Sequence, residues 1–358
     1  MINKKRLIFL LVLLAIVLAV LFSTNILFDF FNSSDILEFE FQKGISYRLE
    51  NYKKEILFIN NEEVSSVNNR GEIVWTVLTG ISDPAVSIKG EYILISDIGG
   101  DSALLIKNGK VINKFQTINT ILCAKVNKNG NTLLVTTETG YKGLATIYKP
   151  DGKEIFKWHS GSGYIADADI SPKNNLIISQ ISTKSSFINS NVILFNTKKN
   201  KKVECANYEN CLVSHLKFND DSSFIALSDV FVSGFSSKGK EKYKIDFSGR
   251  SLTYYNTDYM NNMVLAFKGS VNDTIIETYS HSGKLKSSYR PTDDITTIDV
   301  NGELILITSG RKLYTINSSG KVRTKKELFV DASKVKIFFG RKKAIVFGGN
   351  NAMIYNLY

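Results

Sequence analysis

The sequence predicts an all-β fold, a β-propeller of about eight four-stranded blades, with seven blades as the alternative. Three observations support this prediction. Ile121–Trp158 contains four short runs of strand-forming residues separated by turn signals. The same pattern returns up to the C-terminus at a period of about 40 residues, which is typical of a propeller blade. Two kinds of turn also recur in a fixed order.

The repeating unit is defined by its strands and hairpin turns. Its predicted strands are Leu122–Val126, Thr132–Thr136, Leu144–Tyr148 and Glu154–Trp158. The first hairpin turns at Asn129-Gly130 and the last at Asp151-Gly152. Both dipeptides tolerate the positive φ angles of tight hairpins, so we expect each unit to be four strands joined by short connections.

The turn before the fourth strand marks the copies of this unit. It recurs as Gly71-Glu72, Gly109-Lys110, Gly152-Lys153, Gly239-Lys240, Gly283-Lys284 and Gly320-Lys321. First strands are expected near Ile45, Ala85, Leu122, Ile165, Val213, Thr253, Thr296 and Val335. These positions give the predicted blade count.

The two ends of the repeat region predict how the ring closes. The last unit has only three strands, Val335–Phe338, Ala344–Phe347 and Ala352–Tyr355. Ile36–Phe41, which precedes the first unit, is a suitable fourth strand. Pairing these ends would remove the exposed sheet edges.

The first 28 residues predict an uncleaved membrane anchor. Lys4, Lys5 and Arg6 precede the apolar segment 7–28, which at about 1.5 Å per residue can cross a hydrocarbon core of roughly 30 Å. Because basic residues stay on the cytoplasmic side, residues 1–6 are expected to be a cytoplasmic tail, 29–35 a short tether and 36–358 an extracytoplasmic propeller. The alternative is a cleaved signal peptide, but Val17 or Leu21 occupies the −3 position of the nearest candidate sites, where a small residue is needed.

The charge of the chain bears on its partners. The formal net charge of +11 falls to about +8 if Lys4, Lys5 and Arg6 remain inside. A basic ectodomain can attract an anionic envelope polymer or anionic lipid heads. The alternative is that lysines are simply spread over solvated turns, since no dense basic run is present. The expected extracytoplasmic location disfavours nucleic acid as a binding partner.

The three cysteines leave two interpretations open. Cys205 and Cys211 flank the connection between two units, where strand ends could come within disulfide range. The alternative is that both are small buried thiols. Cys123 lies in a first strand and is expected in the core.

No local motif indicates catalysis, a metal or a cofactor. The chain has no H-E-x-x-H, paired C-x-x-C, Gly-rich phosphate loop or nucleophile elbow. Gly161, Gly163 and Ala166 fit the dinucleotide fingerprint, but that motif requires a strand leading into a helix. Here an alternating strand pattern follows, so we interpret the segment as a flexible loop between strands. We expect no catalytic residue, cofactor or metal, although a constellation assembled across blades would carry no local motif.

The first strands supply candidate shaft residues. Lys125, Asp169, Lys217 and Asp299 each precede the last apolar residue of a first strand, and Cys123, Asp167, His215 and Thr297 stand two positions earlier. Period-two alternation places both sets on one face, and first strands line a propeller's shaft. Lys125, Asp169 and Lys217 are expected to form structural ion pairs, because buried charges must be paired. The alternative makes Asp167, Asp169 and His215 a polar binding site.

A second candidate site is the face that carries the longer loops. These loops are Asp97–Asp101, Thr137–Tyr141, Trp158–Tyr164 and the longest, Gln180–Asn191. The candidate binding residues are Asp97, Asp101, Thr137, Glu138, Tyr141, His159, Tyr164, Lys184 and Phe187. Loops on a rigid scaffold often carry function, although their lengths can also vary without functional meaning.

The segments Asp151–Trp158 and Asn69–Trp75, in which Gly-Lys or Gly-Glu precedes an aromatic strand, resemble bacterial quinoprotein-like and WD-type propeller repeats. With its single N-terminal anchor, the whole chain is similar to a family of uncharacterised single-pass propeller proteins of Gram-positive bacteria. The Trp-Asp repeat ending is missing. The resemblance implies only a fold and a location. It implies no function, because one fold can carry many different functions.

These observations favour a non-enzymatic, membrane-anchored propeller that binds a cell-surface or membrane protein, or an anionic envelope polymer, as a scaffold. One alternative is an envelope glycan hydrolase or lyase with its site at the shaft. Another is a sensor, which would need a membrane partner because so few residues lie in the cytoplasm. The sequence leaves the ligand, the pathway and the oligomeric state undetermined.

Overall fold

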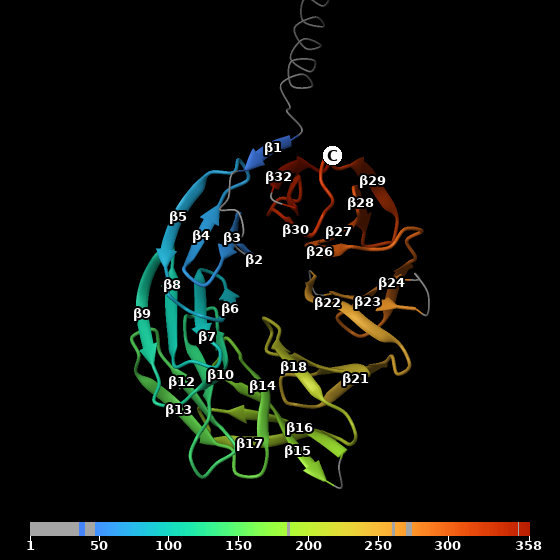
Figure 1. The fold of residues 1–358 in the computed structure, drawn as a ribbon. Coiled ribbons are helices and arrows are strands. Elements are labelled where there is room, and N and C mark those ends of the chain that lie inside the picture. The colour runs from blue at the N-terminus through green and yellow to red at the C-terminus, as the bar shows by residue number, and fades with distance from the viewer. Residues whose placement is uncertain (1–35, 40–46, 185–186, 260–261, 270–273, 350) are drawn as a thin grey trace, which may run out of the picture.

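The computed structural model describes residues 36–39, 47–184, 187–259, 262–269, 274–349 and 351–358. They form eight four-stranded antiparallel sheets arranged around a central axis (Figure 1). The protein is therefore an all-β, eight-bladed β-propeller. The prediction of this fold is confirmed, and the seven-bladed alternative is wrong.

Each blade runs from an innermost first strand to an outermost fourth strand. Blade 1 contains β2 (Arg48–Tyr52), β3 (Glu55–Ile59), β4 (Glu63–Val67) and β5 (Ile73–Leu78). Blade 2 contains β6 (Pro84–Lys89), β7 (Tyr92–Asp97), β8 (Ser102–Lys107) and β9 (Lys110–Gln116). Blade 3 contains β10 (Ile121–Val126), β11 (Thr132–Thr136), β12 (Leu144–Tyr148) and β13 (Glu154–His159). Blade 4 contains β14 (Tyr164–Ile170), β15 (Leu176–Lys184), β16 (Phe187–Asn196) and β17 (Lys201–Tyr208).

The second half of the ring repeats this order. Blade 5 contains β18 (Val213–Phe218), β19 (Phe224–Ser228), β20 (Phe231–Phe235) and β21 (Glu241–Asp246). Blade 6 contains β22 (Ser251–Tyr259), β23 (Asn262–Lys268), β24 (Thr274–Ser280) and β25 (Leu285–Tyr289). Blade 7 contains β26 (Thr297–Asn301), β27 (Leu304–Ser309), β28 (Lys312–Asn317) and β29 (Val322–Glu327). Blade 8 contains β30 (Lys334–Ile337), β31 (Lys343–Gly348) and β32 (Asn351–Asn356), with β1 (Ile36–Phe39) as its fourth strand.

Strand β1 closes the ring. It pairs antiparallel with β32, in a register that runs from Ile36 opposite Tyr355 to Phe39 opposite Ala352. The first described strand of the chain thus completes the last blade (Figure 1). The predicted closure by the two ends of the repeat region is confirmed.

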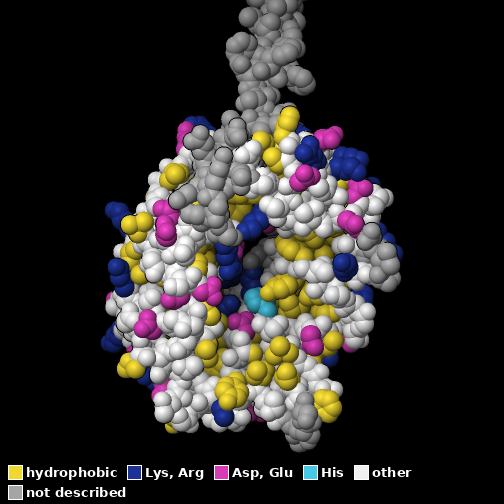
Figure 2. Space-filling model, viewed as in Figure 1, with side chains coloured by type: hydrophobic (Ala, Val, Ile, Leu, Met, Phe, Trp, Pro, Cys, Tyr) yellow, Lys and Arg dark blue, Asp and Glu magenta, His cyan; other side chains and the backbone are white. Residues whose placement is uncertain are grey.

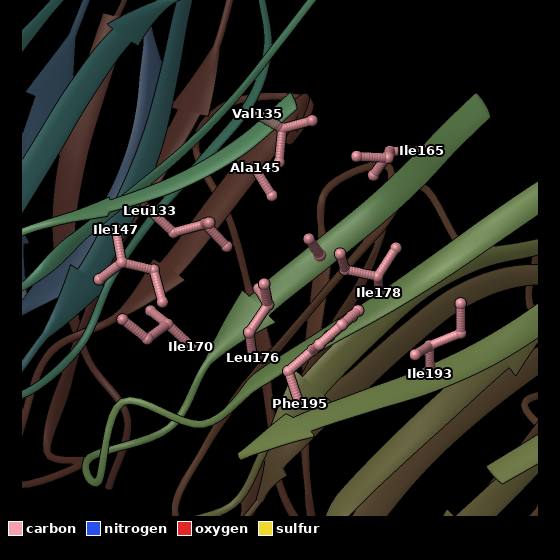
Figure 3. Packing of buried hydrophobic residues seen from close by; sticks show 11 residues of the cluster. Leu133, Val135, Ala145, Ile147, Ile165, Ile170, Leu176, Ile178, Ile193 and Phe195 are labelled. Carbon is pink, nitrogen blue, oxygen red and sulfur yellow. The ribbon is translucent and has the colours of Figure 1, made fainter. Parts of the chain in front are cut away.

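The core is divided among the junctions between blades. Within the described residues, a hydrophobic cluster lies at each of the eight junctions, including the one between blades 8 and 1. Figure 3 shows the cluster between blades 3 and 4, where Leu133 and Ile147 face Ile178 and Phe195. Burying a side chain of this size stabilises the fold by about 1.5–3 kcal/mol. Sheet-to-sheet packing of these apolar faces therefore holds the ring together.

The turn glycines are required by both backbone and packing. Gly130 has a φ of 77°, and a Cβ there would lie 2.5 Å from the ring of Tyr92 on the previous blade. Gly109 has a φ of 72°, and a Cβ there would likewise collide with the side chain of Trp75 in blade 1. An aromatic ring of one blade thus covers the turn glycine of the next.

The two ends of the propeller carry different connections. Turns between first and second strands, and between third and fourth strands, lie at one end, which we call the turn face. Loops between second and third strands, and those between blades, lie at the other end, the loop face. Because Ile36 lies opposite Tyr355 near the end of β32, strand β1 begins at the turn face.

Two sequence predictions need correction or fall outside the described residues. Gln180–Asn191 is not a loop, since β15 and β16 continue as a hairpin in which Gln180 pairs with Asn191 and Lys184 with Phe187. The first strand expected near Ile45 is β2, which begins at Arg48, and Ile45 itself is outside the described residues. The predicted anchor, 7–28, and tether, 29–35, are also outside them. In the part of the chain that the structure describes, no helix has the length and apolar character to span a bilayer.

Candidate functional site

The shaft forms a central cavity of about 550 Å³ to which all eight innermost strands contribute. A second cavity of about 820 Å³ lies beside it towards the loop face and shares Arg48 and Lys336 with it. Lysine and arginine side chains gather around the central opening in Figure 2. The shaft is therefore a polar channel.

Asp167 links three blades across the shaft wall. Its Oδ1 lies 3.6 Å from Lys125 Nζ and accepts a hydrogen bond from Cys123 Sγ at 3.3 Å. Its Oδ2 accepts the backbone N–H of Leu216 at 2.8 Å and lies 3.4 Å from His215 Nδ1. The carboxylate is buried, and its oxygens are occupied by these groups.

A second set of inner side chains binds the backbone of the following blade. In each case the acceptor side chain belongs to the residue that precedes the last apolar residue of a first strand. The donor is the backbone N–H of the last apolar residue in the first strand of the next blade. These contacts are Ser87 Oγ with Val126 N at 3.1 Å, Asp169 Oδ2 with Phe218 N at 2.7 Å and Asp299 Oδ2 with Ile337 N at 2.7 Å. The repetition at three junctions indicates a structural role.

Burial and neighbouring charges set the protonation of these groups. Burial alone would raise the pKa of Asp167, but the hydrogen bond from His215 and the charge of Lys125 outweigh it and lower this pKa. Burial raises the pKa of Asp169, although Lys89 and the Phe218 N–H oppose it. Burial also raises the pKa of Cys123, to about 12. Cys123 therefore remains a protonated thiol and is a poor nucleophile.

The structure separates the predicted shaft residues into two groups. Asp167, Lys125 and His215 come together, whereas Asp169 binds the backbone of Phe218. Lys125 pairs with Asp167 instead of the expected Asp169. Lys217 lines the central cavity. Asp169 and His215 both line the central cavity, and the alternative that they form a polar binding site with Asp167 stays a prediction.

Several shaft residues were missed by the sequence analysis. Lys336 lies 3.3 Å from Asp299 and 3.7 Å from Glu50, and Arg48, Lys89 and Tyr255 also line the cavity. Lys336 precedes Ile337 as Lys125 precedes Val126, so the same alternation could have identified it. Tyr255 lies in β22, where register shifts interrupt the alternation.

The loop-face ends of blades 3 and 4 carry exposed side chains that we call, together, the aromatic patch: Tyr141, His159 and Tyr164 beside the β11–β12 and β13–β14 connections, and Phe187 and Ile188 near the tip of the β15–β16 hairpin. The rings of Tyr141 and His159 lie 4.6 Å apart. Lys142 Nζ lies 4.9 Å from the centre of the Tyr164 ring. Tyr164 is 57% exposed and Phe187 is 55% exposed. These side chains are therefore open to solvent.

The other predicted loop-face residues have local roles or are exposed. Asp97 Oδ1 accepts the N–H of Asp83 at 3.1 Å, and Glu138 Oε2 accepts a hydrogen bond from Asn119 at 3.1 Å. Asp101 and Thr137 are exposed. Lys184 is placed by its backbone pairing with Phe187.

The glycine-containing segment 160–163 connects strand β13 to strand β14, in agreement with the prediction of a strand-to-strand connection. It is held in place, because Ser160 N donates to Gly143 O at 2.8 Å and Gln180 Nε2 donates to Ser160 Oγ at 2.7 Å. Ser160 is fully buried. These bonds fix the base of the aromatic patch and argue against the expected flexibility.

Among the described residues, charged side chains are divided unequally between the turn face and the loop face. The turns of the turn face hold fifteen basic residues: Lys53, Lys54, Arg70, Lys128, Lys149, Lys153, Lys173, Lys198, Lys199, Lys238, Lys240, Lys284, Lys321, Arg341 and Lys342. The same turns hold six carboxylates: Glu72, Glu91, Asp151, Asp220, Asp221 and Glu303. The loops of the loop face hold four basic residues: Lys142, Arg250, Arg290 and Arg311. Those loops hold nine carboxylates: Glu62, Asp83, Asp101, Glu138, Glu209, Asp229, Asp293, Asp294 and Asp331.

The cysteines are free thiols, with Cys211 buried and Cys123 and Cys205 half-buried. This resolves the two interpretations of Cys205 and Cys211 in favour of unpaired thiols. Cys123 packs against the cluster between blades 3 and 4, as expected. Within the described ranges, His, Cys, Asp and Glu side chains form no group of three or more that could hold a metal ion.

Residues 32–357 match a family of unknown function, DUF5711. The chain belongs to this family. No curated protein matches the sequence.

Solved propellers are similar in fold. BamB from Moraxella catarrhalis has a TM-score of 0.53 at 11% identity, with 90% of this chain and 98% of that chain covered. The C-terminal WD40 domain of Sif2 has a TM-score of 0.60 at 11% identity, over the same shares of the two chains. The Dos1 propeller has a TM-score of 0.56 at 11% identity and covers 90% of this chain and 95% of that chain. The likeness to WD-type propellers thus concerns fold alone, and the quinoprotein-like character stays a prediction.

Proposed function

We propose that this protein is a membrane-anchored, extracytoplasmic scaffold that binds a partner protein on its loop face. The aromatic patch carries the proposal, because Tyr141, Tyr164 and Phe187 each expose half or more of their surface. Aromatic side chains supply much of the binding energy in protein interfaces. A partner would cover apolar area that the fold leaves in water.

The patch is supported from below by ordered backbone. Lys142 N donates to Ser160 O at 2.7 Å, and Ser160 N donates to Gly143 O at 2.8 Å. The β11–β12 loop and the β13–β14 connection are therefore joined to each other before a partner arrives. Such pre-organisation lowers the entropy cost of binding.

The direction in which the chain enters the ring supports access to this face. Strand β1 begins at the turn face, so a preceding tether joins the propeller at that end. The predicted tether, 29–35, spans at most about 25 Å when extended. With the predicted anchor 7–28 in the membrane, the turn face would lie near the bilayer and the aromatic patch would point away from it.

Crosslinking on intact cells tests the proposal. The full-length protein is purified after mild crosslinking, alongside the double variant Tyr164→Ser/Phe187→Ser. The matched control is Ile73→Ser/Leu285→Ser, which removes two apolar side chains of similar exposure that begin fourth strands at the turn face. Thermal unfolding of each variant verifies that the ring is intact.

We expect a discrete protein to be recovered with the wild type and with the control, and at least tenfold less of it with the patch variant. This loss corresponds to about 1.4 kcal/mol or more of binding free energy. Equal recovery by all three proteins would exclude the patch as the binding surface. Recovery of diffuse wall polymer alone would contradict a protein partner.

A further inference from the structure

The charge difference between the two ends identifies a second surface. Basic residues outnumber carboxylates by fifteen to six in the turns of the turn face, whereas carboxylates outnumber basic residues by nine to four in the loops of the loop face. Among the described connections between strands, positive charge is therefore concentrated at the end where β1 begins. A lysine-rich composition spread evenly over the molecule would not give this division.

The basic side chains are available to a partner. Lys110, Lys153, Lys240 and Lys321 are exposed at or beside turns of blades 2, 3, 5 and 7. They are thus distributed around the ring and do not form one local patch. A partner that meets all of them must be broad and roughly flat.

Two exposed aromatic rings lie at the same end. Phe339, in the β30–β31 turn, is 61% exposed, and Tyr358, which follows β32, is 56% exposed. Leu357 N donates to Lys342 O at 2.7 Å, so this turn and the end of the chain lie side by side. Both rings belong to blade 8, which β1 completes.

We propose that the turn face lies flat against an anionic phospholipid surface. Each lysine within reach of such a surface raises the association constant by about fivefold. Phe339 and Tyr358 suit the headgroup level, where aromatic rings are favoured. The acidic loop face is repelled, so the attraction also orients the ring. This inference rests on the proposed function only for the membrane anchor, which would hold the propeller near the bilayer.

Lysine footprinting of the full-length chain in vesicles tests this orientation. One set of vesicles contains phosphatidylcholine alone, and the other contains phosphatidylcholine with phosphatidylglycerol. Each is treated with a water-soluble acetylating reagent, and acetylation at individual lysines is measured by mass spectrometry. Lys153, Lys240 and Lys321 report on the turn face, and Lys142 and Lys312 on the loop face.

We expect the three turn-face lysines to react at least fivefold more slowly on anionic vesicles than on neutral ones. The two loop-face lysines should change less than twofold. High salt should abolish the protection, since the Debye length falls to about 3 Å at roughly 1 M. In the variant Lys153→Glu/Lys240→Glu, protection of Lys321 should weaken at least threefold, whereas the matched loop-face variant Lys142→Glu/Arg311→Glu should leave it unchanged.

Other outcomes overturn the proposal in distinguishable ways. Flotation with both vesicle types but equal acetylation at both ends would retain the anchor and exclude the lipid contact. Protection that appears only after soluble poly(glycerol phosphate) is added would assign the face to a polymer instead. Flotation with neither vesicle type would exclude both the anchor and the lipid contact. None of these results tests the proposed binding of a partner protein at the loop face.

Discussion

Asp167 in the shaft and Phe187 on the loop face both occupy positions that are unfavourable for their residue types. Asp167 is a buried carboxylate, whereas Phe187 is a phenyl ring with 55% of its surface exposed. The partners of Asp167 belong to the fold, namely Lys125, His215 and the N–H of Leu216. Phe187 has solvent on one side. The architecture of the ring therefore accounts for the shaft charges, whereas the loop-face rings expose the apolar surface that the proposed partner would cover.

Two phenylalanines on the same strand sharpen this comparison most strongly. Phe195 of β16 is 4% exposed and packs between blades 3 and 4, whereas Phe187 lies at the other end of that strand. We expect Phe195→Ala to lower the free energy of unfolding by about 3–5 kcal/mol, because it leaves a cavity. Phe187→Ala should change it by less than about 0.5 kcal/mol. Chemical denaturation of both variants measures the difference, and similar losses would mean that Phe187 is packed.

A matched pair of carboxylates provides the next test. Asp167→Asn keeps the shape of the side chain but removes the charge that faces Lys125, so we expect a loss of about 1.5–3 kcal/mol in the free energy of unfolding. Asp101→Asn, at an exposed loop-face position, should change it by less than about 0.5 kcal/mol. A neutral outcome for Asp167→Asn would show that the ion pair adds no net stability.

The pH dependence of stability should separate Asp167 from Asp169, with an effect of about 1.4 kcal/mol per unit of pKa shift. Asp167 has a lowered pKa in the folded state, so its contribution is present above the unfolded pKa of about 3.9 and is lost as the pH falls through the folded value. Asp169 has a raised pKa, so its contribution is present below about pH 3.9 and is lost as the pH rises through the folded value.

Thermal unfolding from about pH 3 to about pH 7 covers both ranges. The stability difference between the wild type and Asp167→Asn should shrink below about pH 3.9. The stability of Asp169→Asn relative to the wild type should increase as the pH rises. Parallel curves for the two variants would contradict these opposite assignments.

Most of the fold could be predicted because its signals are local. Turn pairs such as Asn129-Gly130 and Asp151-Gly152 place the hairpins, and the repeat period gives the blades. Gln180–Asn191 was misassigned because polar Ser, Thr and Asn residues suggest a loop, while the backbone pairing across the hairpin depends on both strands together. Local composition does not determine whether two strands stop or continue pairing.

The candidate sites were less predictable because they depend on packing between blades. Alternation placed Asp167 and Asp169 on the shaft face, but the offset between neighbouring sheets decides that Lys125 meets Asp167. The contact of Tyr141 with His159 likewise joins a loop to the end of another strand. Neither contact leaves a periodic signal in the sequence.

The pairing of β1 with β32 has a consequence for biosynthesis. Strand β1 precedes every other described strand in the chain, whereas its partner β32 is the last of the described strands to be synthesised. Seven blades and most of the eighth can form while β1 still lacks its neighbour. Premature termination before β32 would leave unpaired strand edges, which promote aggregation. Closure of the ring therefore depends on synthesis having reached β32.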